Sequence, residues 1–166
     1  MKKAILIVAS IMLTLLCAAA LADVDIAATF PDEIFREIIQ KNFDTDQNGS
    51  LSEQEIEKVT AISCSDQSIQ SLKGIEVFPY LKGLYCSKNK LKELDVSHNT
   101  SLTHLHCDRN KLTKLDVTYN TALVSLEFHS NQITDIDVSH NTELTNLDTE
   151  NNKQIARSEE RRVGKE

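Results

Sequence analysis

Twelve consecutive residues, Asp44 to Glu55, place oxygen-bearing groups at a spacing that suits a hard metal cation. Counting Asp44 as the first position, the oxygens stand at positions one, three, five, seven, nine and twelve, on Asp44, Asp46, Asn48, Ser50, Ser52 and Glu55. Calcium takes about six to eight oxygen ligands, from carboxylates, backbone carbonyls and water. Gly49 at the sixth position permits the sharp turn that lets these oxygens converge. The segment therefore predicts a Ca²⁺ site.

This spacing resembles the calcium loop of an EF-hand. Three carboxylates at these positions would repel one another without a cation, which favours a bound metal over an empty loop. The charge count indicates moderate affinity, and a dissociation constant of ~10⁻⁴ to 10⁻³ M would keep an extracellular site filled. A metal-free helix-loop-helix cap that merely keeps these residues is the alternative interpretation.

The residues on either side of the loop predict two helices that position it. Upstream, five apolar side chains fall on one helical face, at Ile34, Phe35, Ile38, Ile39 and Phe43. Pro31 stands near the start of this helix, where its missing N–H is harmless. Leu51 should anchor the loop, and Ile56 with Val59 should lead the exit helix into the following segment. We expect a short N-terminal segment over 23–29 and an EF-hand helix-loop-helix over 30–58.

A sequence repeat with a constant period dominates the remainder of the chain. Copies of equal length begin at Leu81, Leu102 and Leu123, and a broken copy begins at Leu144. A more divergent first copy, one residue longer than the others, begins at Val59. Such a period is the sequence signature of a stacked-repeat architecture.

The repeated pattern predicts one short strand in each copy. The fourth and sixth positions are apolar and alternate with polar ones, at Leu84, Cys86, Leu105, Cys107, Leu126 and Phe128. The ninth position is an asparagine, whose amide can satisfy backbone groups inside a tight turn, at Asn89, Asn110, Asn131 and Asn152. The segment D-V-S-x-N-T closes each copy with residues that bond their own backbone.

This pattern resembles the leucine-rich-repeat family, in particular secreted bacterial members with LxxLxCxxNxLxxLDxSxNT repeats. The resemblance covers residues 59–156, about 4.5 repeats. It implies an α/β solenoid, a leucine-rich-repeat coil with a short parallel β-sheet on the concave face, preceded here by the EF-hand cap. Calcium would then be structural, because the cap would shield the first apolar edge of the solenoid. Family members mostly bind other proteins.

The residues between the buried strand positions vary from copy to copy, so they predict the partner-binding surface. They include Tyr85, His104, His106, Asp108, Glu127, His129 and Asp148. Neighbouring strands lie about 4.8 Å apart, so the histidines with Asp108 and Glu127 could instead hold a transition metal. Glycan binding would need exposed aromatic rings, and these positions offer only Tyr85.

Three cysteines remain after residue 23, at Cys64, Cys86 and Cys107. A disulfide framework is one interpretation. All three occupy the same inward repeat position, however, which favours buried free thiols. A zinc site is disfavoured because a linear stack does not converge tetrahedrally.

The N-terminus predicts export. Lys2 and Lys3 precede an apolar run, and small residues follow, which is typical of a signal peptide over residues 1–22 cleaved before Asp23. A retained membrane anchor and a lipoprotein anchor on Cys17 are the alternatives. The run is short of the ~20 apolar residues of a spanning helix, and Leu16 before Cys17 is not small. We expect a secreted or cell-surface protein with no transmembrane segment after signal removal.

The last ten residues, 157–166, resemble the translated sequence of a common sequencing adapter and predict a non-native tail; a genuine charged tail is the alternative.

A net charge of −7 disfavours nucleic acid as a partner. The sequence has neither a Gly-rich phosphate loop nor a nucleophile elbow, which disfavours an enzyme. We therefore predict a protein-binding module with a structural calcium site, whose partner stands on a host or neighbouring cell. A truncated recognition domain of a larger bacterial surface adhesin or enzyme is the alternative.

Overall fold

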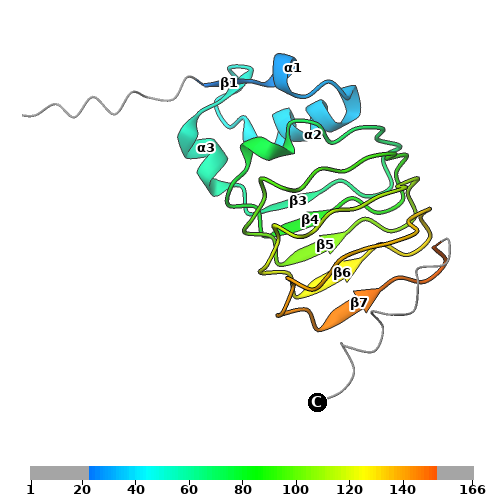
Figure 1. Ribbon diagram of the computed structural model, residues 1–166. Coiled ribbons are helices and arrows are strands. Elements are labelled where there is room, and N and C mark those ends of the chain that lie inside the picture. The colour runs from blue at the N-terminus through cyan, green and yellow to red at the C-terminus, as the bar shows by residue number, and fades with distance from the viewer. Residues whose placement is uncertain (1–22, 153–166) are drawn as a thin grey trace, which may run out of the picture.

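The computed structural model describes residues 23–152, and Figure 1 shows a helical N-terminal cap stacked on one end of a coiled sheet. The predicted signal peptide over 1–22 and the predicted non-native tail over 157–166 both lie outside the described residues. Within the described part, none of the helices is both long and apolar enough to span a bilayer.

The cap is built from two very short strands and three helices. In chain order they are β1 (Val24–Asp25), α1 (Ile26–Thr29), α2 (Glu33–Phe43), β2 (Ser50–Leu51) and α3 (Glu53–Lys58). Each helix begins where an N-cap side chain accepts a backbone N–H that the helix leaves free, at Asp25, Asp32 and Ser52. In α3 the Glu55 carboxylate accepts the backbone N–H of Ser52, which completes a capping box.

The apolar face predicted for α2 is correct except at one position. Phe35 and Ile39 are fully buried, and Ile38 and Phe43 pack partly against the core. Ile34 is 37 % exposed, because the buried side of this helix is narrower than the five apolar residues suggest. Leu51 is fully buried, as predicted for the residue that anchors the loop.

The solenoid is a parallel sheet in which each coil adds one strand beside the last. The strands are β3 (Ala61–Ser63), β4 (Gly83–Tyr85), β5 (His104–His106), β6 (Ser125–Glu127) and β7 (Asn146–Asp148), paired in chain order. A 3₁₀ turn, η1 (Ile75–Val77), lies in the first coil. Ala61 pairs with Gly83, and Gly83 pairs with His104, so the first coil is one residue longer than the second. The parallel solenoid and both repeat lengths predicted from the sequence are thus confirmed.

One ladder of asparagines holds the turn after each strand. In the middle of the ladder, Asn110 donates its side-chain N–H groups to the carbonyls of Cys86 and Cys107, and its Oδ1 accepts the N–H of Leu91. Equivalent bonds recur on the neighbouring coils, at Asn89, Asn131 and Asn152. Each asparagine therefore satisfies backbone groups of its own coil and of the coil before it, which confirms the predicted role of the ninth position.

A second ladder runs along the opposite turn, where the sequence pattern predicted only local bonds. The side-chain amide of Asn120 donates to the carbonyls of Val96 and Asn99, both on the preceding coil. The members of this ladder are fully or almost fully buried, at Asn99, Asn120 and Asn141. The predicted local bonds are present as well, since Asp116 accepts the N–H of Thr118. The asparagine of the D-V-S-x-N-T segment thus joins coils rather than only closing a turn.

An aromatic cluster joins the cap to the first coil. Phe30 stacks on Phe78 with ring centroids 6.0 Å apart and meets Phe35 edge to face at 5.7 Å. Phe43, the last residue of α2, lies 6.0 Å from Phe78. Rings from the N-terminal segment, from α2 and from the first coil thus form one contact region that continues the core of the solenoid.

The three cysteines stack inside successive coils as free thiols. Cys64, Cys86 and Cys107 are all buried, and Phe128 takes the same position in the next coil. Burial raises the pKa of the Cys64 thiol to about 12, and it raises the pKa values of Cys86 and Cys107 as well. Thiols in this state act as small apolar side chains.

Candidate calcium site and sheet surface

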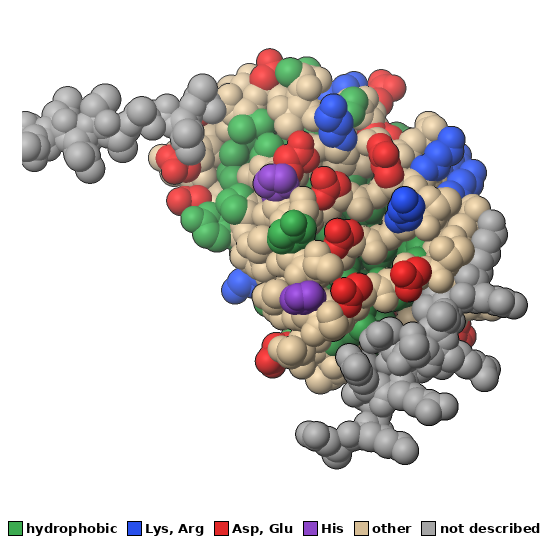
Figure 2. All heavy atoms as spheres, viewed as in Figure 1, with side chains coloured by type: hydrophobic (Ala, Val, Ile, Leu, Met, Phe, Trp, Pro, Cys, Tyr) green, Lys and Arg blue, Asp and Glu red, His purple; other side chains and the backbone are tan. Residues whose placement is uncertain are grey.

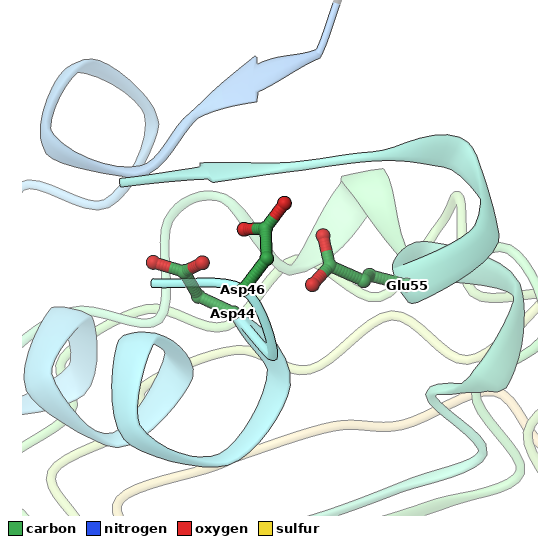
Figure 3. A group of neighbouring side chains, drawn as sticks. All are labelled: Asp44, Asp46 and Glu55. Carbon is green, nitrogen blue, oxygen red and sulfur yellow. The ribbon is translucent and has the colours of Figure 1, made fainter. Parts of the chain in front are cut away.

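The loop between α2 and α3 brings three carboxylates together. Oxygen atoms of Asp44, Asp46 and Glu55 lie within 4.8 Å of one another. Figure 3 shows Asp44 and Asp46 projecting from the start of the loop and Glu55 from α3 toward the same space beside β2. Asp44 and Glu55 are buried, whereas Asp46 is exposed. Two of the three negative charges thus stand in a partly dehydrated position, where a nearby cation would stabilise them.

Backbone N–H groups fold the loop around Asp44. Its two carboxylate oxygens accept the N–H of Asn48 and the N–H of Gly49, each at 3.0 Å. The turn requires left-handed backbone at Gln47, with φ of 58°, and at Gly49, with φ of 84°. The predicted role of Gly49 in the sharp turn is therefore confirmed.

Glu55 has a second role, which the loop spacing alone did not indicate. One carboxylate oxygen accepts the N–H and the hydroxyl of Thr45, both at 2.6 Å, and the other accepts the N–H and the hydroxyl of Ser52, both at 2.9 Å. The Thr45 hydroxyl is the largest of the influences that lower the pKa of Glu55 to about 2. Glu55 thus remains ionised at neutral pH and joins the two ends of the loop.

The remaining predicted ligands occupy the loop in different ways. Asn48 Oδ1 accepts the N–H of Ser50 at 2.7 Å. The Ser52 hydroxyl lies within the capping box, where it donates to Glu55. The structure therefore gathers the three carboxylates and assigns Ser52 to the start of α3. The available donors are all oxygen atoms and include three carboxylates, which fits a hard cation such as calcium.

Two histidines face carboxylates on neighbouring coils. One pair lies on strands β5 and β6, and the other lies in the turns that follow these two strands. His106 Nδ1 lies 3.7 Å from Glu127 Oε2, and His129 Nε2 lies 3.4 Å from Asp108 Oδ2. The ring of Tyr85 meets that of His106 edge to face at 5.1 Å. The predicted partner-binding residues thus lie together on one surface, which we call the sheet surface: Tyr85, His104, His106, Asp108, Glu127, His129 and Asp148.

Asp108 is more buried than an exposed recognition residue would be, at 8 % exposure. Its carboxylate accepts the hydroxyl of Ser87 on the preceding coil and also faces Arg109. These contacts indicate that Asp108 organises the surface and offers little area to a partner.

The alternating strand pattern predicts exposed positions at Gly83 and Ser125, but both residues are buried. Gly83 lies beneath the ring of Tyr85, since a Cβ at Gly83 would stand 2.9 Å from that ring. Ser125 bonds His106 Nε2 at 3.2 Å and accepts the amide of Asn146 at 3.0 Å. Large neighbouring side chains therefore cover these two small residues.

The alternative of a transition metal on the sheet finds no geometric support. Among residues 23–152, the loop carboxylates form the one group of three or more acidic, histidine or cysteine side chains whose ligand atoms approach closely enough for an ion. His106 and His129 each pair with a single carboxylate instead, and His104 contacts the Thr103 hydroxyl.

Away from the sheet, an aspartate recurs at the same position of three successive coils, at Asp95, Asp116 and Asp137. Figure 2 shows acidic side chains recurring over successive coils on the face in view. Each of these carboxylates accepts local hydrogen bonds, from Ser97, Thr118 and Ser139, and these bonds lower the three pKa values. The recurrence of these three aspartates is thus explained by the turns that their hydrogen bonds close.

The chain is similar in sequence and fold to bacterial internalins, and no protein-family model matches it. Over 71 residues, or 43 % of this chain, it is 36 % identical to internalin J of Listeria monocytogenes. A solved structure of the functional domain of internalin J, described as including a cysteine ladder, has a TM-score of 0.70 and 36 % identity over 82 % of this chain.

Two other internalins of the same organism share the fold. The internalin inlF gives a TM-score of 0.68 at 25 % identity over 76 % of this chain and 39 % of the other. Internalin C2 gives 0.63 at 18 % identity over 81 % and 71 %. This chain spans 8 % of the length of the curated internalin J and 35 % of its solved domain. The described chain is therefore a parallel-sheet solenoid of about four turns, similar to the leucine-rich-repeat domains of bacterial internalins.

Proposed function

We propose that this chain is an exported, non-catalytic recognition module that binds a protein through the sheet surface. The observation that carries the proposal is the arrangement of partly exposed aromatic, histidine and acidic side chains on adjacent strands, with Tyr85, His106 and Glu127 in direct register. A rigid parallel sheet presents these side chains at fixed spacing, so little conformational entropy is lost when a partner binds. The likeness to internalins and the signal-like N-terminus support a partner outside the bacterial cell.

Site-specific photo-cross-linking tests this surface. A benzoylphenylalanine placed at His106 should form discrete adducts with host or neighbouring-cell surface proteins. The same group at His140, an exposed residue of the turn before β7, is the matched control and should form none of these adducts. Identical adducts from both positions, or none from His106, would contradict recognition through the sheet surface.

We further propose that the cap is an EF-hand whose calcium ion is structural. The convergence of Asp44, Asp46 and Glu55 supports this role, as does the packing of Phe43, the residue before the loop, against Phe78 of the first coil. Calcium bound to the folded loop and absent from the unfolded chain would stabilise the cap by mass action.

Asp46→Asn is the sharpest test of the calcium site. The hydrogen bonds that the structure gives Asp46 are local ones from Asn48, on separate oxygens. An asparagine oxygen can still accept the backbone N–H, and water can replace the side-chain bond at this exposed position. Without metal, the variant should melt at the temperature of the unmodified chain. At about 5 mM CaCl₂, the unmodified chain should melt higher and Asp46→Asn should not. Asp135→Asn, which removes the same charge from an exposed coil position, should respond as the unmodified chain does.

Glu55→Gln is a poorer probe of the calcium site. The four N–H and hydroxyl groups that donate to Glu55 would lose a charged acceptor, so the variant would be destabilised even without metal. Calorimetric titration of the unmodified chain provides the direct measurement. An absence of binding up to ~10 mM calcium would reduce the segment to a metal-free cap.

The small share of internalin J that this chain spans favours one further candidate, a recognition domain of a larger surface adhesin or enzyme. The genomic reading frame beyond residue 156 tests it. Additional coding sequence for an anchor or a second domain would support this candidate, and a stop codon would contradict it.

A further inference from the structure

The two residues of β1 pair with the calcium loop itself. Val24 lies opposite Leu51 and Asp25 opposite Ser50, in an antiparallel arrangement. Figure 3 shows β2 running beside the three carboxylates, with β1 along its other edge. A segment that precedes the helix-loop-helix thus forms one wall of the loop.

The pairing constrains the backbone at the seventh loop position. Ile26 donates its N–H to the carbonyl of Gly49 at 3.1 Å, so this pair is hydrogen-bonded. Hydrogen-bonded and non-bonded pairs alternate along an antiparallel ladder, which makes Asp25 and Ser50 a non-bonded pair. The N–H of Ser50 accordingly turns back into the loop, to Asn48 Oδ1. The carbonyl of Ser50 lies on the same side as its N–H, so β1 directs that oxygen toward the loop.

The N-terminal segment that contains β1 is itself fixed to the solenoid. Ile26 is 2 % exposed, and Phe30 is fully buried against Phe78 of the first coil. Asp25 accepts the N–H of Ala28 and so begins α1 immediately after the strand. β1 therefore connects the loop mechanically to the first coil and is not a loose terminal strand.

We propose that β1 is a positioning strand of the cation site, which holds the Ser50 carbonyl in place as a ligand for a hard divalent cation. The proposal rests on the proposed calcium function. Groups that orient metal ligands without touching the metal typically contribute about 10- to 100-fold to affinity. Calcium and β1 pairing should also stabilise each other, because coupling between two equilibria is reciprocal.

Val24→Pro in the full chain tests this role. Proline removes the N–H that a hydrogen-bonded Val24–Leu51 pair requires and leaves every oxygen of the loop in place. Calorimetric titration with CaCl₂ should give an affinity about 10- to 100-fold weaker than that of the unmodified chain. Val24→Ala controls for the lost side chain, and Asp23→Pro controls for proline one residue before the strand. Both controls should bind about as tightly as the unmodified chain.

The outcomes distinguish the role of β1 from the calcium site itself. If the unmodified chain binds calcium and Val24→Pro binds it equally well, the role of β1 is wrong and the calcium site stands. If the unmodified chain does not bind calcium, both the calcium site and the role of β1 are wrong. Amide hydrogen exchange of the unmodified chain decides the matter where Val24→Pro fails to fold. Calcium should slow exchange at Ile26 and Leu51, and equal rates in calcium and in EGTA would overturn the proposal.

Discussion

Asp32, the N-cap of α2, accepts the backbone N–H of Gln70 at 2.8 Å, although 38 residues separate the two in the chain. The same Oδ2 atom accepts the N–H of Ser71, and Oδ1 accepts the N–H of Phe35 within the helix. A single half-buried carboxylate thus begins the helix that enters the loop and fastens it to the first coil.

We expect Asp32→Ala to lower the free energy of unfolding by about 2 kcal/mol, because it removes a helix cap together with two charge-assisted bonds to the coil. Urea unfolding measures the change. Asp25→Ala, which removes an exposed cap from the short helix α1, should cost only about 0.5 kcal/mol. Equal losses in the two variants would show that the bonds to Gln70 and Ser71 add nothing to capping.

Acid should weaken the cap through Glu55. Its pKa in the folded chain is lowered to about 2, from an ordinary value of 4.5, chiefly by the Thr45 hydroxyl. A carboxyl with a lowered pKa stabilises the folded state above its unfolded value, and this contribution is lost as the pH falls. In EGTA, the melting temperature should therefore fall as the pH decreases from about 4.5 toward 2.

Glu55→Gln isolates this carboxyl from the others, including the three acidic turn residues whose pKa values are also lowered. The gap in melting temperature between the unmodified chain and the variant should be widest above pH 4.5 and should narrow toward pH 2. A gap that does not change across this range would contradict the assignment of the acid sensitivity to Glu55.

The sequence predicted the parts of this fold that repeat. The constant period of the later copies sets the pairing of β4 through β7, and the longer first copy sets the longer step between Ala61 and Gly83. Alternating apolar residues predicted which side of each strand is buried. The ninth-position asparagines were also predictable, because an amide at a fixed place in every copy has to meet the same backbone groups each time.

The contacts that join distant segments only once were not predictable. β1 is too short for an alternating pattern, and it pairs with a strand that follows the whole of α2 and the first half of the loop, since Val24 lies opposite Leu51. The bond from Asp32 to Gln70 likewise has no local signal. The burial of Asp108 depends on Ser87 of another coil. The ligand role of the loop and the partner role of the sheet surface remain predictions.

The ladder at the ninth position should be most costly to break in the interior of the stack. Asn110→Ala would leave the N–H of Leu91 and the carbonyls of Cys86 and Cys107 without a side-chain partner, in a buried turn. We expect a loss of about 3 kcal/mol in the free energy of unfolding.

Asn152→Ala is the matched control, since its residue makes the same kind of bonds in a partly exposed turn. Water can replace those bonds, so the loss should be about 1 kcal/mol. A loss at Asn152 as large as that at Asn110 would show that burial does not set the cost. Thermal or urea unfolding provides the measurement for both variants.

The constant step between strands β4 and β7 has a consequence for how such chains diversify. Residues 102–122 make one full coil, and their removal would bring Leu123 to the place of Leu102, beside Leu81. Asn131 would then face the backbone of Leu91 and Cys86, which Asn110 bonds now. Duplication of the same stretch would be equally compatible with the ladders. Unequal recombination between the repeated gene segments can therefore lengthen or shorten the recognition surface in increments of one strand, about 4.8 Å each, without any new core having to evolve.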